Sequence, residues 1–219
     1  MMAALTMNRF LRPKSEEPPA GAPPALSAHT DQTLAQQARR GDPDAFGELV
    51  RRHQQAVFNV ALRMTGSRPD AEDATQETFL RAFRAFKQFD SHRPLAPWLK
   101  RIAVNVCLNW YEANRIRPAV TEADLARPGE AAADLDEWQA NVTTPEQRYL
   151  AREQAAAVRA AILQLPPAYR AVIELRHFQN LSYEEIATTL GRPLSSVKSD
   201  LFRARKQLAQ ALAAENRDL

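Results

Sequence analysis

The stretch that decides the fold is LSYEEIATTLGRPLSSVKSDLFRARKQL, residues 181–208. Ser182 is followed three residues later by Glu185, the spacing of a capping box, in which two side chains satisfy backbone donors at the start of a helix. Gly191 permits the positive φ of a tight turn, and a second helix is expected to begin near Pro193. A helix, a glycine turn and a second helix of this length predict a helix-turn-helix.

The second of these helices has two distinct faces when residues advance by about 100° each. The apolar residues gather on one face, expected to be buried: Leu194, Val197, Leu201, Ala204 and Leu208. The opposite face is basic and hydroxyl-bearing: Ser195, Ser199, Phe202, Arg203 and Lys206, with Lys198 at its margin. In a major groove, cations hold phosphates or guanine edges, and an aromatic ring meets thymine methyls. The alternative is an ordinary charged surface helix, but the outward Phe202 favours DNA binding.

Asp200 is the one acid among five cations between Arg192 and Lys206. It lies on the flank of the outer face, where it either accepts a hydrogen bond from a cytosine amino group or pairs with a neighbouring arginine. We favour the pairing.

Two further helices are expected before this motif, at Glu146–Leu163, closed by Pro166-Pro167, and at Ala168–Phe178. They complete a second domain over 146–215. Residues 121–137 carry six acids against one arginine, a net charge of −5, so 116–145 is interpreted as an extended linker. Two readings of the linker stay open: a solvated tether, or an acidic strand lying in a basic channel of a partner.

The first domain is expected over 31–115 and is also helical. Asp42-Pro43 is an N-cap followed by proline, and Gly66 ends the helix whose apolar stripe runs from Phe46 to Met64. A second helix opens at Asp70, and a third runs from Trp98 to about Arg115 after a loop over 89–97. One face of the second helix is expected to be buried: Ala71, Ala74, Phe79, Ala82, Phe83 and Phe86.

The fold class is therefore all-α, with two small helical domains joined by an acidic flexible linker and a helix-turn-helix in the second. No stretch alternates for long with the period of a strand. Residues 1–30 hold five prolines and few apolar side chains, which predicts a disordered tail.

The charge of the first domain changes sign along the chain. The acids after Asp70 either complement the helix dipole or, with Asp73, Gln76 and Glu77 on one face, offer a surface to a basic protein. Downstream, the aromatic side chains of Phe89, His92 and Trp98 are interleaved with cations. In sites for single-stranded nucleic acid, such aromatic rings hold an unstacked base and the cations follow the phosphate backbone. The pattern therefore suggests a single-stranded nucleic-acid site. These cations are interrupted only by Asp90: Arg81, Arg84, Lys87, Arg93, Lys100 and Arg101. For Trp98 itself we favour core packing.

Composition excludes several classes of function. The 219 residues carry a net charge of only +3, so nucleic-acid binding has to come from the placement of charges. The single cysteine, Cys107, excludes an intramolecular disulfide and is expected in the core. The histidines are dispersed and no glycine-rich phosphate loop occurs, so we expect no enzyme, no metal and no cofactor. No apolar run is long enough to span a membrane, and the first ten residues lack a signal-peptide pattern, so a cytoplasmic protein is expected.

Four motifs in order resemble the extracytoplasmic-function sigma factors of the sigma-70 family. They are DAEDATQETF (70–79), WLKRIAVN (98–105), LPP (165–167) with LSYEEIA (181–187), and VKSDLFRAR (197–205). The resemblance spans about 31–212. It implies an alternative sigma factor that binds core bacterial RNA polymerase and directs promoter recognition and DNA melting. The implied partners are that polymerase, promoter DNA (duplex at −35 and single-stranded at −10) and an anti-sigma protein.

The resemblance also implies roles for individual residues. The segment that docks on the clamp helices of the largest polymerase subunit contains Asp73, Gln76, Glu77 and Leu80. The −10 element meets a loop and the helix after it, where a flipped base is captured: Phe89, Asp90, Ser91, His92, Arg93, Lys100, Arg101 and Asn105. The −35 element is read in the major groove by Ser195, Ser196, Lys198, Ser199, Phe202, Arg203 and Lys206. The linker threads toward the RNA exit path. The −10 loop and Asp200 depart from the family pattern, so family base preferences are not transferred.

The main rival is a free-standing helix-turn-helix transcriptional regulator. It explains 146–212 equally well but gives no reason for the acidic face at 73–77 or for the basic, aromatic loop. A regulator binds duplex operator alone, whereas a sigma factor binds promoter DNA weakly until polymerase is present.

Overall fold

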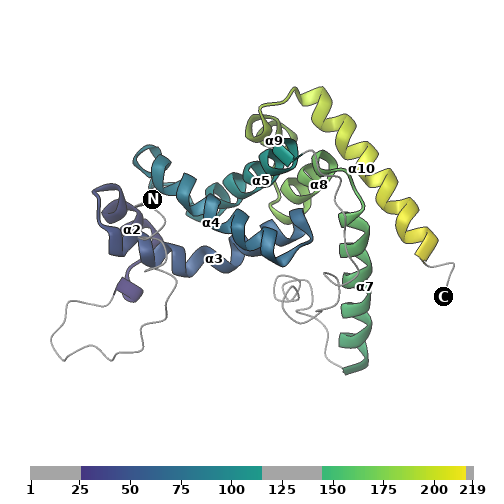
Figure 1. Ribbon diagram of the computed structural model, residues 1–219, viewed down its shortest axis with the longest axis horizontal. Helices are drawn as coiled ribbons and strands as arrows, with labels where there is room; N and C mark the ends of the chain where they lie inside the picture. The colour runs from purple at the N-terminus through teal and green to yellow at the C-terminus, as the bar shows by residue number, and fades with distance from the viewer. Residues whose placement is uncertain (1–25, 115–144, 216–219) are drawn as a thin grey trace.

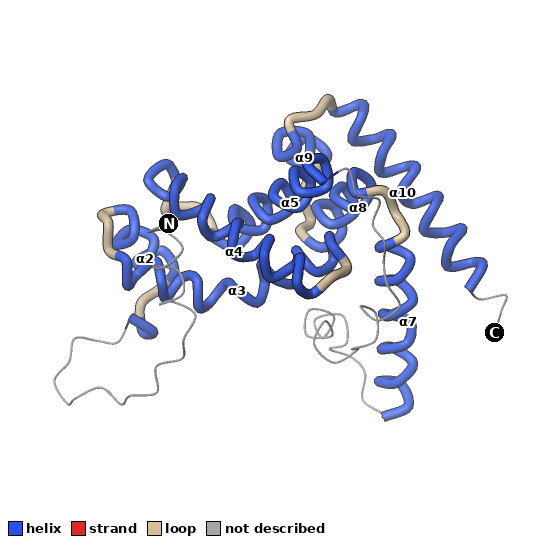
Figure 2. Tube along the Cα trace, in the orientation of Figure 1, coloured by secondary structure: helices blue, strands red, loops and turns tan. Residues whose placement is uncertain are grey.

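A computed structural model of the 219-residue chain describes residues 26–114 and 145–215. Within these two ranges the regular structure is helical, with eight α-helices and no strand (Figure 2). Residues 1–25 of the tail predicted over 1–30, and residues 116–144 of the linker predicted over 116–145, lie outside the described residues, whereas Pro145 belongs to a helix. The all-α prediction is confirmed.

The first group of helices is α2 (Asp31–Arg39), α3 (Pro43–Thr65), α4 (Arg68–Ala85) and α5 (Leu95–Asn114). The Asp42 carboxylate accepts hydrogen bonds from the backbone N–H groups of Asp44 (2.9 Å) and Ala45 (3.1 Å) and so caps α3. Gly66 ends that helix with φ of 75°. The predicted cap and stop of α3 are both confirmed.

Three details of this group differ from the prediction. The turn η1 (Leu26–Ala28) precedes α2, and Arg52 donates hydrogen bonds to the carbonyls of Leu26, Ser27 and His29. The prediction of disorder over 1–30 is therefore wrong for residues 26–30. Hydrogen bonds from Arg52 and packing of Leu26 against the apolar core hold this segment.

The boundaries of the next two helices also shift. The helix α4 begins at Arg68, two residues before the predicted Asp70, because Ser67 supplies the N-cap. The helix α5 begins at Leu95, and the stretch η2 (Phe86–Gln88) precedes the loop. Phe83 was expected on the buried face of α4 but is 59% exposed, although its ring lies edge-on to Phe46.

The second group is α7 (Pro145–Leu163), α8 (Pro167–Ile173), the π-helical stretch η3 (Glu174–Phe178), α9 (Tyr183–Leu190) and α10 (Leu194–Glu215). Both hydrogen bonds of the predicted capping box are present between Ser182 and Glu185, at 2.8 and 3.2 Å. Gly191 follows α9 with φ of 60°. The helix-turn-helix is confirmed.

The two groups lie against each other instead of standing apart (Figure 1). Helices α3 and α5 contact α7 and α8, and one buried apolar cluster continues from α3–α5 into α7, α8 and α10. Cys107, in α5, is fully buried within this cluster, as expected. The position of the second group therefore decides which surfaces of the first are open.

Candidate nucleic-acid and polymerase interfaces

The helix α10 presents the two faces that its periodicity predicts. Val197, Leu201 and Ala204 are buried, and Leu194 and Leu208 are half-buried. The outer face is exposed at Ser195, Lys198, Ser199, Phe202, Arg203 and Lys206, whereas Ser196 is half-buried. Phe202 is 70% exposed. A basic face with hydroxyls and an outward aromatic ring, on the second helix of a helix-turn-helix, has the chemistry of a major-groove reader.

Asp200 belongs to the inner side of α10. Its residue is 7% exposed, and its carboxylate lies 2.6 Å from Nη1 of Arg192. The expected pairing with an arginine is therefore present. The sequence predicted Asp200 on the flank of the outer face. Because its side chain is buried, it does not belong to the exposed face proposed to read bases.

The acidic face of α4 is open. Asp73 and Gln76 are exposed, Leu80 is half-buried against the core, and Glu77 accepts a hydrogen bond from Arg81 at 2.7 Å. Because the helix begins at Arg68, Asp73 and Glu77 lie beyond its first turn, where the helix dipole fades. The dipole accounts for Asp70 but not for these two acids, which favours the reading as a surface for a partner.

The loop between η2 and α5 is built on a local turn. The Asp90 carboxylate accepts a hydrogen bond from the backbone N–H of His92 (3.0 Å), which holds the loop in shape. The Phe89 ring is 5% exposed and lies between Phe86 and Trp98, with centroids 5.6 and 4.8 Å away. Core packing of Trp98 is confirmed, and Phe89 is part of the same cluster. Asp90, His92 and Arg93 are exposed, but Ser91 is buried.

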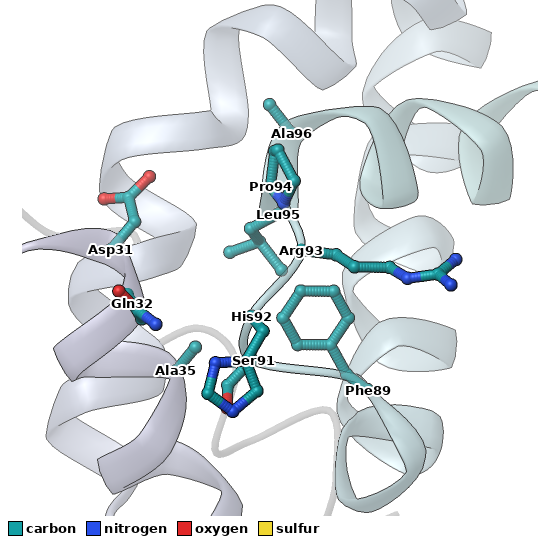
Figure 3. Close-up of a pocket in the computed structure, with 10 residues that line it drawn as sticks. All are labelled: Asp31, Gln32, Ala35, Phe89, Ser91, His92, Arg93, Pro94, Leu95 and Ala96. Atoms are coloured by element: carbon teal, nitrogen blue, oxygen red, sulfur yellow. The ribbon is translucent and has the colours of Figure 1, made fainter.

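A cavity of about 310 Å³ opens between this loop and α2 (Figure 3). The α2 side is formed by Asp31, Gln32 and Ala35. The other side is formed by Phe89 and Ser91–Ala96. In Figure 3 the Arg93 side chain points away from α2. The sequence reasoning named most of the loop side but missed α2 entirely, because nothing in residues 31–39 signals that they face residues 89–96.

The carboxylate of Asp31 is held in its ionised form at the edge of this cavity. Burial opposes ionisation, but hydrogen bonds from Arg52 (2.9 Å) and His53 (2.7 Å) outweigh it and lower the Asp31 pKa. Arg39 also reaches Ser91 Oγ at 3.4 Å. The α2 wall is therefore fixed both to α3 and to the loop.

The cationic strip of α5 lies against the second group of helices. Lys100, Arg101 and Asn105 are half-buried. The Asn105 amide donates a hydrogen bond to the carbonyl of Thr189 (3.2 Å), and Arg101 lies 3.7 Å from the carboxylate of Glu185. Both partners are in α9, so Arg101 and Asn105, two of the residues predicted to face DNA, contact the helix-turn-helix in this structure.

Two family models match the chain in order. Sigma-70 region 2 matches residues 49–116, and Sigma-70 region 4 matches residues 155–208. The RNA polymerase sigma-H factor of Pseudomonas aeruginosa is 34% identical over 187 residues, which cover 85% of this chain and 96% of that protein. The ECF RNA polymerase sigma-E factor of Haemophilus influenzae is 37% identical over 179 residues, covering 82% and 93%.

A solved structure, CnrH in complex with the cytosolic domain of CnrY, is also similar. It has 31% identity and a TM-score of 0.52, and the match covers 84% of this chain and 97% of that one. The two family models, matched in order, define a two-region transcription initiation factor. The chain belongs to the sigma-70 family, in its extracytoplasmic-function group.

Its function is that of an alternative sigma factor: it binds core RNA polymerase and directs promoter recognition and DNA melting for transcription initiation. The free-standing regulator is thereby set aside, since such a protein has no need of region 2. Among the described residues, no helix is long and apolar enough to cross a membrane, and no cluster of His, Cys, Asp and Glu is arranged to hold a metal.

Proposed function

We propose a division of labour between the two regions. Residues 31–115 form the domain that docks on polymerase and handles the −10 element. Residues 146–215 form the domain that reads the −35 element, and 116–145 is the linker that runs toward the RNA exit path. Because the two domains are tethered, two DNA contacts of modest affinity combine to give a complex of higher affinity.

The observation that carries the −35 assignment is the exposed outer face of α10. Phe202 is 70% exposed on a face that otherwise carries hydroxyl and cationic side chains, where an aromatic ring is placed to meet thymine methyls. The residues assigned to the major groove are Ser195, Ser196, Lys198, Ser199, Phe202, Arg203 and Lys206. Ser196 is half-buried at the edge of this face, so it is assigned a peripheral contact with DNA.

The cavity between α2 and the loop is proposed as the site for an unstacked −10 base. Its volume of about 310 Å³ exceeds that of one nucleobase, and exposed His92 and Arg93 stand beside it. Phe89 and Ser91 line the cavity and are buried, so neither offers an exposed stacking surface. The α5 residues Lys100, Arg101 and Asn105 would hold the adjoining strand, and Asp90 shapes the loop.

Polymerase docking is assigned to Asp73, Gln76, Glu77 and Leu80 on α4. An exposed acidic face with one apolar residue at its edge suits a basic, partly apolar partner surface. By analogy with CnrH, which was solved with the cytosolic domain of CnrY, we also propose a protein partner of the anti-sigma kind.

The protein would act in the cytoplasm, without cofactor and without catalysing a reaction itself. It would contribute by binding two DNA elements and the polymerase at the same time.

In vitro transcription with purified core polymerase on fragments of the source genome tests the proposal. Start sites that appear only with the protein, and that share two upstream elements, would support it and supply the promoter sequence. The Phe202→Ala variant should lose these transcripts, while Gln54→Ala, at an exposed position of α3 that is assigned to none of the proposed sites, should keep them. Unchanged transcription with Phe202→Ala would contradict the −35 assignment.

A further inference from the structure

One arginine connects the two helices of the helix-turn-helix across their turn. The backbone N–H of Arg192 donates a hydrogen bond to the carbonyl of Ala187 in the last turn of α9, at 3.0 Å, the bond that closes a helix ending in glycine. Its guanidinium reaches in the other direction, to α10, where Nη1 lies 2.6 Å from the carboxylate of Asp200. Arg192 is therefore held by both helices.

Asp200 meets this arginine from the buried side of α10. The residue is 7% exposed, and Val197 and Ala204, about one turn away on the same side of the helix, are fully buried. A buried carboxylate that loses its cation is strongly destabilising. The charge of Asp200 is tolerated here because Arg192 pairs with it.

This pair fixes the rotation of α10 about its axis in a way that apolar packing does not. Hydrophobic contacts are non-directional, whereas an ion pair at 2.6 Å depends on the positions of particular atoms. Ser199 and Phe202 are exposed on the outer face of the same helix. A rotation that moved Asp200 would move these two side chains through the same angle, because all residues of a helix turn together. The setting of the proposed base-reading side chains is therefore coupled to the buried pair.

The pair also takes one cation away from the DNA backbone. The Arg192 side chain is 36% exposed and its charge is directed to Asp200. From the turn before α10, an unpaired arginine can contact a phosphate of the DNA that α10 binds, and such a contact carries no sequence information. The four other cations up to residue 206 are all exposed: Lys198, Arg203, Arg205 and Lys206.

We propose that the Arg192–Asp200 pair determines the specificity of −35 recognition without touching a base. Asp200 positions α10 for base reading and keeps Arg192 off the DNA backbone, so that affinity depends on the outer face. Both are positioning residues. This role rests on the proposed function of α10 in reading the −35 element, whereas the withholding of Arg192 from phosphates does not depend on which bases are read.

Binding of holoenzyme, assembled from core polymerase and the full-length protein, to two short duplexes tests the proposal. One duplex carries the −35 element found by the transcription assay, and the other has the same composition with that element scrambled. The ratio of the two affinities measures specificity. The slope of log affinity against log salt on the scrambled duplex counts phosphate contacts. Because every variant is bound to the same core polymerase, differences between variants belong to this chain.

The variant Asp200→Ala should change both quantities. Alanine removes the carboxylate and is a good helix former, so α10 should persist. The specificity ratio should fall by about tenfold, the value of one good base contact, because the outer face loses its fixed setting. The salt slope should steepen by about 0.9, because the freed Arg192 gains one phosphate. Adding Arg192→Gln to Asp200→Ala should return the slope to that of the unaltered protein and leave the ratio low.

Two further variants serve as controls. Glu184→Ala removes an exposed acid from α9 of the same motif, and it should change the ratio by less than about twofold and the slope by less than about 0.3. Arg192→Lys keeps a cation opposite Asp200, so both quantities should stay close to those of the unaltered protein. Thermal unfolding followed by circular dichroism checks that each variant is folded.

The outcomes separate a specificity role from support of the fold. A lower ratio without a steeper slope would show that Asp200 only supports α10 and would overturn the proposal, as would an unchanged ratio. Equal steepening by Glu184→Ala would assign the effect to net charge and also overturn it. If unaltered holoenzyme does not prefer the −35 duplex, the −35 assignment itself is wrong and the specificity role falls with it, while the slope still decides whether Asp200 withholds Arg192.

Discussion

At the scale of single residues, the direction in which a side chain points on α10 separates recognition from support. Arg203 stands outward and exposed, whereas Asp200, three residues earlier, is buried and held by Arg192. The neighbouring Tyr169 of α8 raises the pKa of the Arg203 guanidinium above its ordinary value. Neighbours in sequence therefore have opposite roles.

We expect Arg203→Ala to weaken −35 binding by holoenzyme by about ten- to a hundredfold, since one good bidentate contact to a base is worth roughly 1–3 kcal/mol. Affinity for core polymerase should not change. Fluorescence anisotropy with duplex −35 DNA and with core polymerase measures both. Gln207→Ala, at an exposed uncharged position on the same helix, serves as the control. Loss of polymerase binding by Arg203→Ala would remove Arg203 from the −35 site.

At the scale of elements, α4 carries a partner surface beyond its own capping. Ser67 and Asp70 satisfy and complement the start of the helix, so Asp73 is left without a structural reason for its charge. Glu72, on a neighbouring position, is paired with Arg68 at 2.9 Å.

The charge reversal Asp73→Lys should therefore weaken binding to core polymerase by about tenfold and leave thermal unfolding unchanged, because the side chain is exposed. Pull-down titration and calorimetry provide the two readouts. The comparison is Glu72→Lys, which reverses a charge one position away and should affect polymerase binding less. If Asp73→Lys binds core polymerase with unchanged affinity, Asp73 is not part of the docking surface and serves only the N-terminal end of the helix.

The helix α3 holds α2 and η1 through a carboxylate that responds to pH. Hydrogen bonds from Arg51, and after them from Arg52, outweigh burial and lower the Glu48 pKa to about 2. Arg52 in turn binds Asp31 and the carbonyls of η1.

Because the folded-state pKa of Glu48 lies below the unfolded value, its contribution to stability is fully present above about pH 4.5. The contribution is lost as the pH falls toward 2. We expect the unfolding midpoint of Glu48→Gln to lie below that of the unaltered protein at pH 7, and the difference to shrink steadily between pH 4.5 and 2. Thermal unfolding followed by circular dichroism across this range measures it; a difference that stays constant with pH would show that Glu48 contributes only through neutral packing.

At the scale of the whole molecule, the relation between the regions decides what α5 is available for. Its Asn105 donates a hydrogen bond to the carbonyl of Thr189 in α9, so a contact with DNA requires this bond to break.

In holoenzyme, Asn105→Ala should slow open-complex formation by about tenfold while changing duplex promoter binding by less than about twofold, because the residue meets DNA only after the strands part. Permanganate reactivity of unpaired thymines follows melting, and a filter-binding assay follows duplex binding. Equal effects on both would remove Asn105 from the melting site.

The sequence by itself determined the helices and most of their ends, because these depend on spacings within a few residues. The capping box at Ser182–Glu185, the glycine stops at Gly66 and Gly191, and the outward face of α10 all follow from local periodicity and local hydrogen bonds. The motifs in order likewise indicated the family before any fold was known.

Only the tertiary structure decided the α2 wall of the cavity, the burial of Phe89 and Asp200, and the covering of Asn105 by Thr189. The same holds for Arg63 with Glu174, which meet across 111 residues of sequence. Such pairs have no signature in local spacing, since a charged residue on a helix looks the same whether it faces water or a second region. The physical reason is that burial and pairing are properties of where two elements meet, and that place is set by the packing of the whole chain.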